Sequence, residues 1–66
     1  DAIVATIGDN IVVKNAPLDS VVNVYASNGA LVATEVVTDG DVVVETPIKG
    51  IYIVSVNGKN FKVMVK

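Results

Sequence analysis

The chain has 66 residues, 52% of them hydrophobic, with 7 acidic and 5 basic residues and a formal net charge of −2. This length allows one domain, residues 1–66, with one thin core and little room for a deep ligand cavity. An acidic chain without Arg argues against a nucleic-acid partner, because phosphate binding needs clustered Lys and Arg. Without Cys the chain can form no disulfide, thiolate zinc site or cysteine nucleophile.

Valine occupies 16 positions, and its branched side chain packs well on a pleated surface, so the composition favours strands over helices. No window shows a sustained helical repeat of apolar residues. No apolar run approaches the ~20 residues that span a bilayer, and the basic flank of a signal peptide is absent. We therefore expect no membrane span, and we expect any export signal to lie outside this chain.

Turn residues recur roughly every 8–12 residues, which is typical of a sandwich or barrel of short strands. Asn-Gly and Asp-Gly pairs tolerate the positive φ that a tight hairpin turn requires. Seven strands are predicted: Ala2–Ile7, Ile11–Lys14, Val21–Ala26, Leu31–Thr38, Val42–Thr46, Ile51–Val56 and Phe61–Lys66. We expect them to form two packed antiparallel sheets with no helix longer than one turn.

The last hairpin has a register that its turn predicts. If Asn57 and Gly58 form a two-residue loop, Val56 faces Lys59 and Val54 faces Phe61. One face is then almost entirely apolar: Tyr52, Val54, Val56, Lys59, Phe61, Val63 and Val65. The other face is mixed: Ile51, Ile53, Ser55, Asn60, Lys62, Met64 and Lys66. We expect the apolar face to point to the core, with the ammonium of Lys59 reaching water beside the turn.

The hairpin at Asn28 and Gly29 has two possible registers. A two-residue loop would set Glu35 opposite Val22, on the face that also carries Val24. A bulge at Gly29 would shift the pairing by one residue. The sequence leaves both registers open.

No residues suited to catalysis or to a metal are apparent. The chain has three serines but no His that could act as a general base, and its lysines fall at strand ends, turns or outer positions. Asp39 and Asp41 flank Gly40, but the apolar run from Val42 does not supply the alternating oxygen ligands of a calcium loop, so we interpret them as charges at a hairpin tip. The five glycines are dispersed at predicted turns. We expect no enzyme activity, no cofactor and no metal.

The three aromatic residues give little support to ligand stacking. Tyr52 and Phe61 fall on the predicted core face, whereas Tyr25 could be exposed, and there is no Trp. What remains is the backbone edge of the last strand, which another chain could pair with. Lys62 and Lys66 lie on its outer side and would discourage random pairing.

Three segments carry a family resemblance: Val22–Val32, with Val-x-Val-Tyr, an Asn-Gly turn and Leu-Val; Lys49–Val56, with Lys-Gly-x-Tyr-x-Val; and the terminal Phe61–Lys66. In this order and spacing the chain, from about Ile11 onward, resembles the C-terminal sorting domains of the type IX (Por) secretion system and closely related small C-terminal domains of secreted Gram-negative proteins. The Pro-Asn-Pro element with which such domains usually begin is absent, and Asn15-Ala16-Pro17 does not replace it.

The resemblance implies an immunoglobulin-like sandwich behind a covalently linked N-terminal passenger domain, read by outer-membrane secretion machinery. We also expect the chain to be a monomer. It implies export through the periplasm to the cell surface or the medium. The residues expected to determine the fold are Gly50, Tyr52, Val54, Phe61 and Val63. The possible recognition strand comprises Phe61, Lys62, Val63, Met64, Val65 and Lys66. The main alternative function is a structural spacer or adhesion module of a cell-surface protein, and a carbohydrate-binding module is a weaker one.

Overall fold

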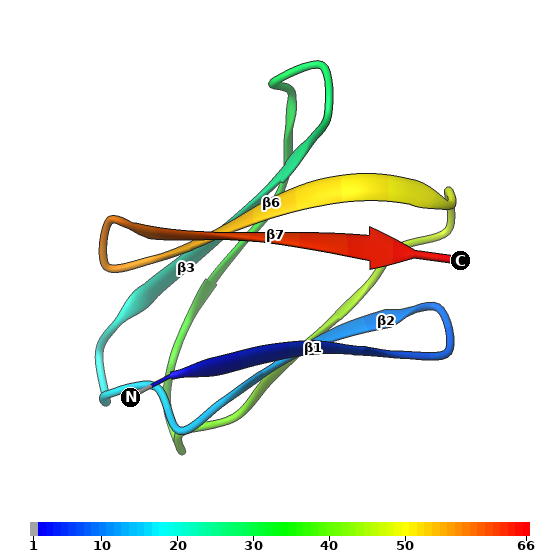
Figure 1. The fold of residues 1–66 in the computed structure, drawn as a ribbon. Helices are drawn as coiled ribbons and strands as arrows, with labels where there is room; N and C mark the ends of the chain where they lie inside the picture. The colour runs from blue at the N-terminus through cyan, green and yellow to red at the C-terminus, as the bar shows by residue number, and fades with distance from the viewer. Residues whose placement is uncertain (1) are drawn as a thin grey trace.

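The computed structural model describes residues 2–66, in which seven β-strands and no helix occur (Figure 1). The strands are β1 (Ile3–Ile7), β2 (Asn10–Lys14), β3 (Val21–Ala26), β4 (Leu31–Val36), β5 (Val42–Glu45), β6 (Gly50–Val56) and β7 (Lys59–Val65). No strand end differs from its predicted position by more than two residues. The all-β class and the number of strands predicted from the sequence are confirmed.

The strands form two sheets, one of three strands in the order β1-β2-β5 and one of four in the order β4-β3-β6-β7. Every pairing is antiparallel. An immunoglobulin sandwich likewise places its first, second and fifth strands in one sheet and its third, sixth and seventh in the other. The fourth strand of that fold lies in the sheet of the first, second and fifth, whereas here β4 pairs with β3, so the small β-sandwich shares the sheet assignment of the other six strands.

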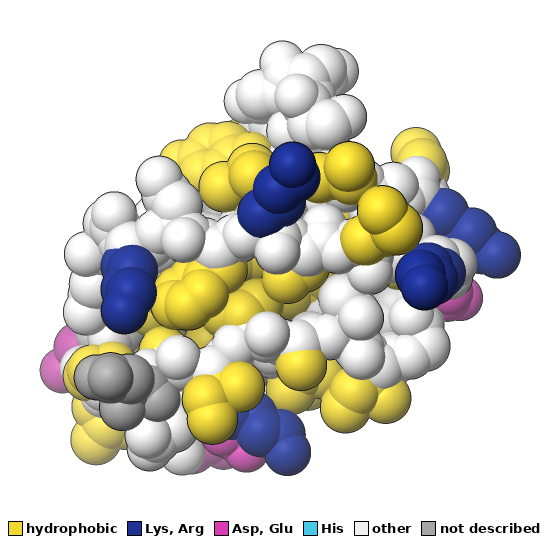
Figure 2. Space-filling view, in the orientation of Figure 1, with side chains coloured by type: hydrophobic (Ala, Val, Ile, Leu, Met, Phe, Trp, Pro, Cys, Tyr) yellow, Lys and Arg dark blue, Asp and Glu magenta, His cyan; other side chains and the backbone are white. Residues whose placement is uncertain are grey.

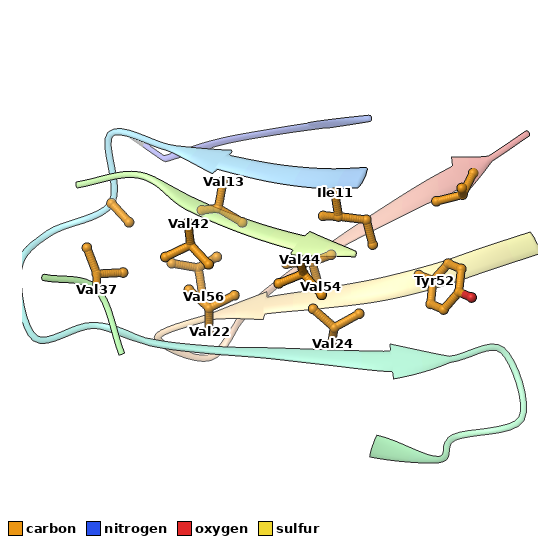
Figure 3. Close-up of a cluster of buried hydrophobic side chains, with 12 residues drawn as sticks. Ile11, Val13, Val22, Val24, Val37, Val42, Val44, Tyr52, Val54 and Val56 are labelled. Carbon is orange, nitrogen blue, oxygen red and sulfur yellow. The ribbon is translucent and has the colours of Figure 1, made fainter. Parts of the chain in front are cut away.

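The core lies between the two sheets and is made mainly of valine (Figure 3). Ile11 and Val13 of β2 point toward Val24 of β3 and Val54 of β6, and all four side chains are fully buried. Alternate residues of each strand face inward because side chains in a strand alternate between its two faces. The other buried residues of this core are Ala16, Val22, Val37, Val42, Val44, Tyr52, Val56 and Val65. Val12 is buried as well, but on the outer face of the three-stranded sheet, between Ala5 and Val43.

The β6–β7 hairpin has the predicted register, with Val56 opposite Lys59 and Val54 opposite Phe61. Asn57 (φ 51°) and Gly58 (φ 84°) form the two-residue turn, and both adopt the positive φ of a type I′ turn. The predicted apolar face points inward. Phe61 departs from the prediction in degree, because it is only half-buried where β7 lies at the edge of its sheet.

The β3–β4 hairpin combines the two registers that the sequence left open. At its tip a three-residue loop ends at Gly29 (φ 90°), and the N–H of Ala26 donates to the carbonyl of Ala30 at 2.9 Å. The register then shifts by one residue, because Tyr25 pairs with Leu31 whereas Val24 pairs with Ala33. Beyond the shift the pairs are those of a two-residue loop, with Val22 opposite Glu35.

The Asp39-Gly40 turn is not a hairpin tip, so this interpretation was wrong. β4 and β5 belong to different sheets, and the turn lies in the connection that crosses between them. The N–H of Asp41 donates to the carboxylate of Asp39 at 3.3 Å, and the N–H of Ala16 donates to the carbonyl of Gly40 at 3.1 Å. Asp-Gly suits either kind of turn, and only the strand pairing distinguishes them.

Candidate functional site

The recognition strand predicted from the sequence, Phe61–Lys66, corresponds to β7 and lies at the edge of the four-stranded sheet. β7 is the outer strand of the four-stranded sheet and pairs with β6, and β1 is the outer strand of the other sheet and pairs with β2. β7 and β1 lie along the same side of the sandwich (Figure 1). Within residues 2–66, no strand pairs with the second edge of β7, so its N–H and C=O groups there are outside the ladder.

The side chains of the predicted recognition strand separate into two groups. Val65 is 1% exposed, and Phe61 and Val63 are half-buried against the core, so these residues anchor the strand. Lys62 is exposed and Met64 is 52% exposed on the outer face of the sheet. Lys66, directly after β7, is exposed as well. The strand is therefore fixed on one face and displays two lysines and a methionine to solvent.

A depression of about 350 Å³ lies at the turn end of this edge. It is lined by Ala2, Asn15, Pro17, Val56, Asn57, Lys59 and Phe61. The ammonium of Lys59 lies 5.7 Å from the centroid of the Phe61 ring, a cation–π distance. Figure 2 shows this side of the molecule, where lysines surround an apolar hollow. The sequence does not reveal the depression, because its walls come from segments far apart in the chain.

Asn57 holds the turn between β6 and β7 against the start of β3. Its side-chain amide donates from Nδ2 to Oγ of Ser20 at 3.0 Å, and its Oδ1 accepts from the N–H of Val21 at 3.3 Å. The Ser20 hydroxyl in turn donates to the carbonyl of Pro17 at 2.5 Å. From the sequence, Asn57 is recognisable only as a turn former, because these hydrogen bonds, which we call the Asn57 clamp, join residues that are up to 37 positions apart.

Tyr52 fixes the other end of the hairpin. Its phenolic O–H donates to the carbonyl of Ile48, in the connection between β5 and β6. This is the arrangement of a tyrosine corner, in which a tyrosine near the start of the sixth strand bonds back to the preceding corner. Gly50 lies between the two residues with φ 148°, a conformation that residues with a Cβ rarely adopt. Gly50 and Tyr52, both predicted fold determinants, therefore belong to one local structure.

The remaining polar residues have structural partners or lie in solvent. Within residues 2–66, every buried side-chain nitrogen or oxygen has a hydrogen-bond partner. Thr46, which is 1% exposed, donates through its hydroxyl to the carbonyl of Asp9 at 2.6 Å. The described residues include no cluster of three or more acidic side chains placed to hold a metal ion. They also include no helix long and apolar enough to cross a membrane.

Comparisons with families of known proteins, with curated proteins and with solved structures gave no match for this chain.

Proposed function

We propose that this chain is a non-catalytic C-terminal sorting module, and that outer-membrane secretion machinery of the type IX kind reads it through β7. The observation that carries the proposal is the position of this strand. β7 lies at an open sheet edge, where Val65 anchors it in the core while Lys62 and Lys66 remain exposed. The order and spacing of the three sequence segments described above support the same function.

An edge strand of this kind offers two means of recognition. Its unpaired backbone groups can accept an added strand, which supplies affinity through main-chain hydrogen bonds. Its lysines add charge-dependent selectivity and limit pairing with arbitrary chains. The tyrosine corner and the Asn57 clamp hold both ends of the β6–β7 hairpin, so a partner would meet a strand that is already ordered.

On this proposal the module is covalently attached behind a passenger domain. The passenger and module pass through the periplasm together, and the passenger then reaches the cell surface or the medium. No enzyme activity of the module, no cofactor and no nucleic acid is involved. The catalytic or binding work of the whole protein belongs to the passenger.

The test is to fuse residues 1–66 behind a reporter that carries its own signal peptide, in a host with the type IX system. We expect the parent fusion at the cell surface or in the medium. The double substitution Lys62→Ser with Lys66→Ser should impair this export without unfolding the module. The matched control, Lys14→Ser with Lys49→Ser, removes the same charge outside β7 and should leave export near the parent level. A parent fusion that stays folded and entirely periplasmic would overturn the proposal.

One observation favours the alternative of a structural spacer or adhesion module. The outer face of the three-stranded sheet exposes Ile3 (60%), Ile7 (60%) and Val43 (58%). These side chains share a face, because Ala5 between the two isoleucines pairs with Val12, which pairs with Val43. An apolar face of this kind suits contact with a neighbouring domain. This function would replace the first if the parent fusion remained in the periplasm.

A further inference from the structure

The sandwich carries opposite charges on its two sides. β7 and the residue that follows it contribute Lys59, Lys62 and Lys66, and neither β1 nor β7 contains an acidic residue. Figure 2 looks onto this side, where lysines surround the apolar hollow and acidic side chains appear only near the outline. We call this side, formed by β1 and β7, the basic edge.

The other side is acidic. β4 and β5 are the outer strands there, because β1 lies beside β7 and the sheet orders are β1-β2-β5 and β4-β3-β6-β7. The segment from β4 through β5 contains no lysine and four acidic residues: Glu35, Asp39, Asp41 and Glu45. All four side chains are exposed. We call this side the acidic edge.

Both edges also end in an open strand. Within residues 2–66, β4 pairs only with β3, and β7 pairs only with β6. Three antiparallel steps separate β4 from β7, so the two strands run in opposite directions. If a second copy is shifted along the sheet without rotation, its β4 lies antiparallel to β7 of the first. That is the pairing geometry used everywhere else in the sandwich.

We propose that copies of this chain associate head to tail, the basic edge of one copy against the acidic edge of the next. The charges select this arrangement over the alternatives. Two basic edges would bring lysines together, and two acidic edges would bring carboxylates together, so the symmetric contacts are repulsive. An unlike contact leaves one free edge of each kind, and the assembly therefore grows beyond a dimer.

The association is weak and depends on local concentration. Exposed ion pairs contribute little individually and are screened by salt. The register shift in the β3–β4 hairpin and the lysines of β7 both restrain edge pairing. We therefore expect a monomer in dilute solution and the contact only where many copies are crowded together. This inference does not depend on the proposed sorting function.

Sedimentation velocity of residues 1–66 over a concentration series tests the contact. At ~10 mM ionic strength, where the Debye length is ~30 Å, the weight-average sedimentation coefficient should rise steadily with concentration. At ~1 M, where that length is ~3 Å, it should return to the monomer value. A parent chain that remains monomeric throughout the low-salt series overturns the proposal. Association that stops at a dimer, or that is unchanged at high salt, also overturns it.

Charge reversal identifies the edges involved. Lys59→Glu, Lys62→Glu and Lys66→Glu together make both edges acidic, and Glu35→Lys, Asp41→Lys and Glu45→Lys together make both basic, so each triple variant alone should lose the concentration dependence. The variant that combines all six substitutions exchanges the signs of the two edges, keeps the parent net charge of −2 and should associate like the parent. Circular dichroism would confirm that each variant is folded. If the combined variant is folded and monomeric, edge complementarity is not the cause.

Discussion

The β6–β7 and β3–β4 hairpins lie in the same sheet and differ in what holds them. In β6–β7, Tyr52 and Val54 are buried, the turn has two residues and Asn57 ties it to the start of β3. In β3–β4, the outer strand exposes Leu31 at 58%, and the register shifts beside Tyr25. A hairpin whose inner residues enter the core can hold one register, because a slip of one residue would bring its apolar side chains to solvent.

A slip of one residue would change the burial of fewer side chains in β4 of the β3–β4 hairpin. Glu35 lies opposite Val22 and remains exposed at the rim, and Val36 is also exposed on β4. Few side chains of this outer strand would change environment if the pairing moved. Loop geometry at Gly29 and the later shift set its register instead. The comparison indicates that burial fixes one hairpin and turn geometry the other.

The largest expected effect distinguishes the two hairpins by burial. Tyr52→Ala should cost roughly 3–5 kcal/mol of unfolding free energy, because it removes a buried aromatic side chain, and a domain this small has only a few kcal/mol in total. Leu31→Ala, the control at an exposed position of β4, should cost less than about 0.5 kcal/mol. Thermal unfolding followed by circular dichroism measures both. Similar melting temperatures for the two variants would contradict the burial argument.

The second prediction concerns the two asparagines at the hairpin turns. Asn57→Ala should lower the unfolding free energy by about 2–3 kcal/mol, because alanine is strained at φ 51° and the two side-chain hydrogen bonds, to the Ser20 hydroxyl and from the Val21 N–H, are lost. Asn28→Ala loses one exposed bond to the N–H of Ala30 and should cost less than about 1 kcal/mol. Urea unfolding of both variants gives these values.

Asn57→Gly separates the two contributions at the first turn. Glycine adopts the positive φ without strain but makes no side-chain hydrogen bonds. Its unfolding free energy should therefore fall between those of the parent and Asn57→Ala. If Asn57→Gly matches the parent, the clamp to Ser20 contributes nothing.

Phe61→Ala sharpens the comparison within the β6–β7 hairpin itself. The ring is only half-buried, so its removal should cost about 1–2 kcal/mol, less than the loss of Tyr52. Chemical denaturation of Phe61→Ala and Tyr52→Ala side by side tests the order. A larger loss for Phe61 would mean that β7 packs more deeply than the structure shows.

The smallest change tests the tyrosine corner alone. Tyr52→Phe keeps the buried ring and removes the hydroxyl that donates to Ile48, so it should cost about 1 kcal/mol. Differential scanning calorimetry on Tyr52→Phe and the parent would resolve it as a lower melting temperature. An unchanged melting temperature would show that the ring, without its hydrogen bond, holds the corner.

The sequence predicted what local chemistry and alternation determine. Turn residues and valine content predicted the seven strands, and the two-residue turn at Asn57 with an apolar face predicted the register of the last hairpin. The nature of the Asp39-Gly40 turn was not predictable, because whether two consecutive strands pair or cross between sheets depends on packing far along the chain. The Asn57–Ser20 bond, the depression beside Phe61 and the opposition of the two charged edges are non-local in the same way.

Amide hydrogen exchange along β7 tests most directly whether this strand is anchored on one side and open on the other. In an antiparallel edge strand only alternate residues place their N–H groups in the ladder. Every second amide of β7 should therefore be protected, with the intervening amides exchanging fast, whereas β6 should be protected throughout the stretch from Tyr52 to Val56, where it is paired on both sides. Slow exchange at every amide of β7 would show that its edge is already covered, and fast exchange at all of them would show that the strand is not held by the sheet.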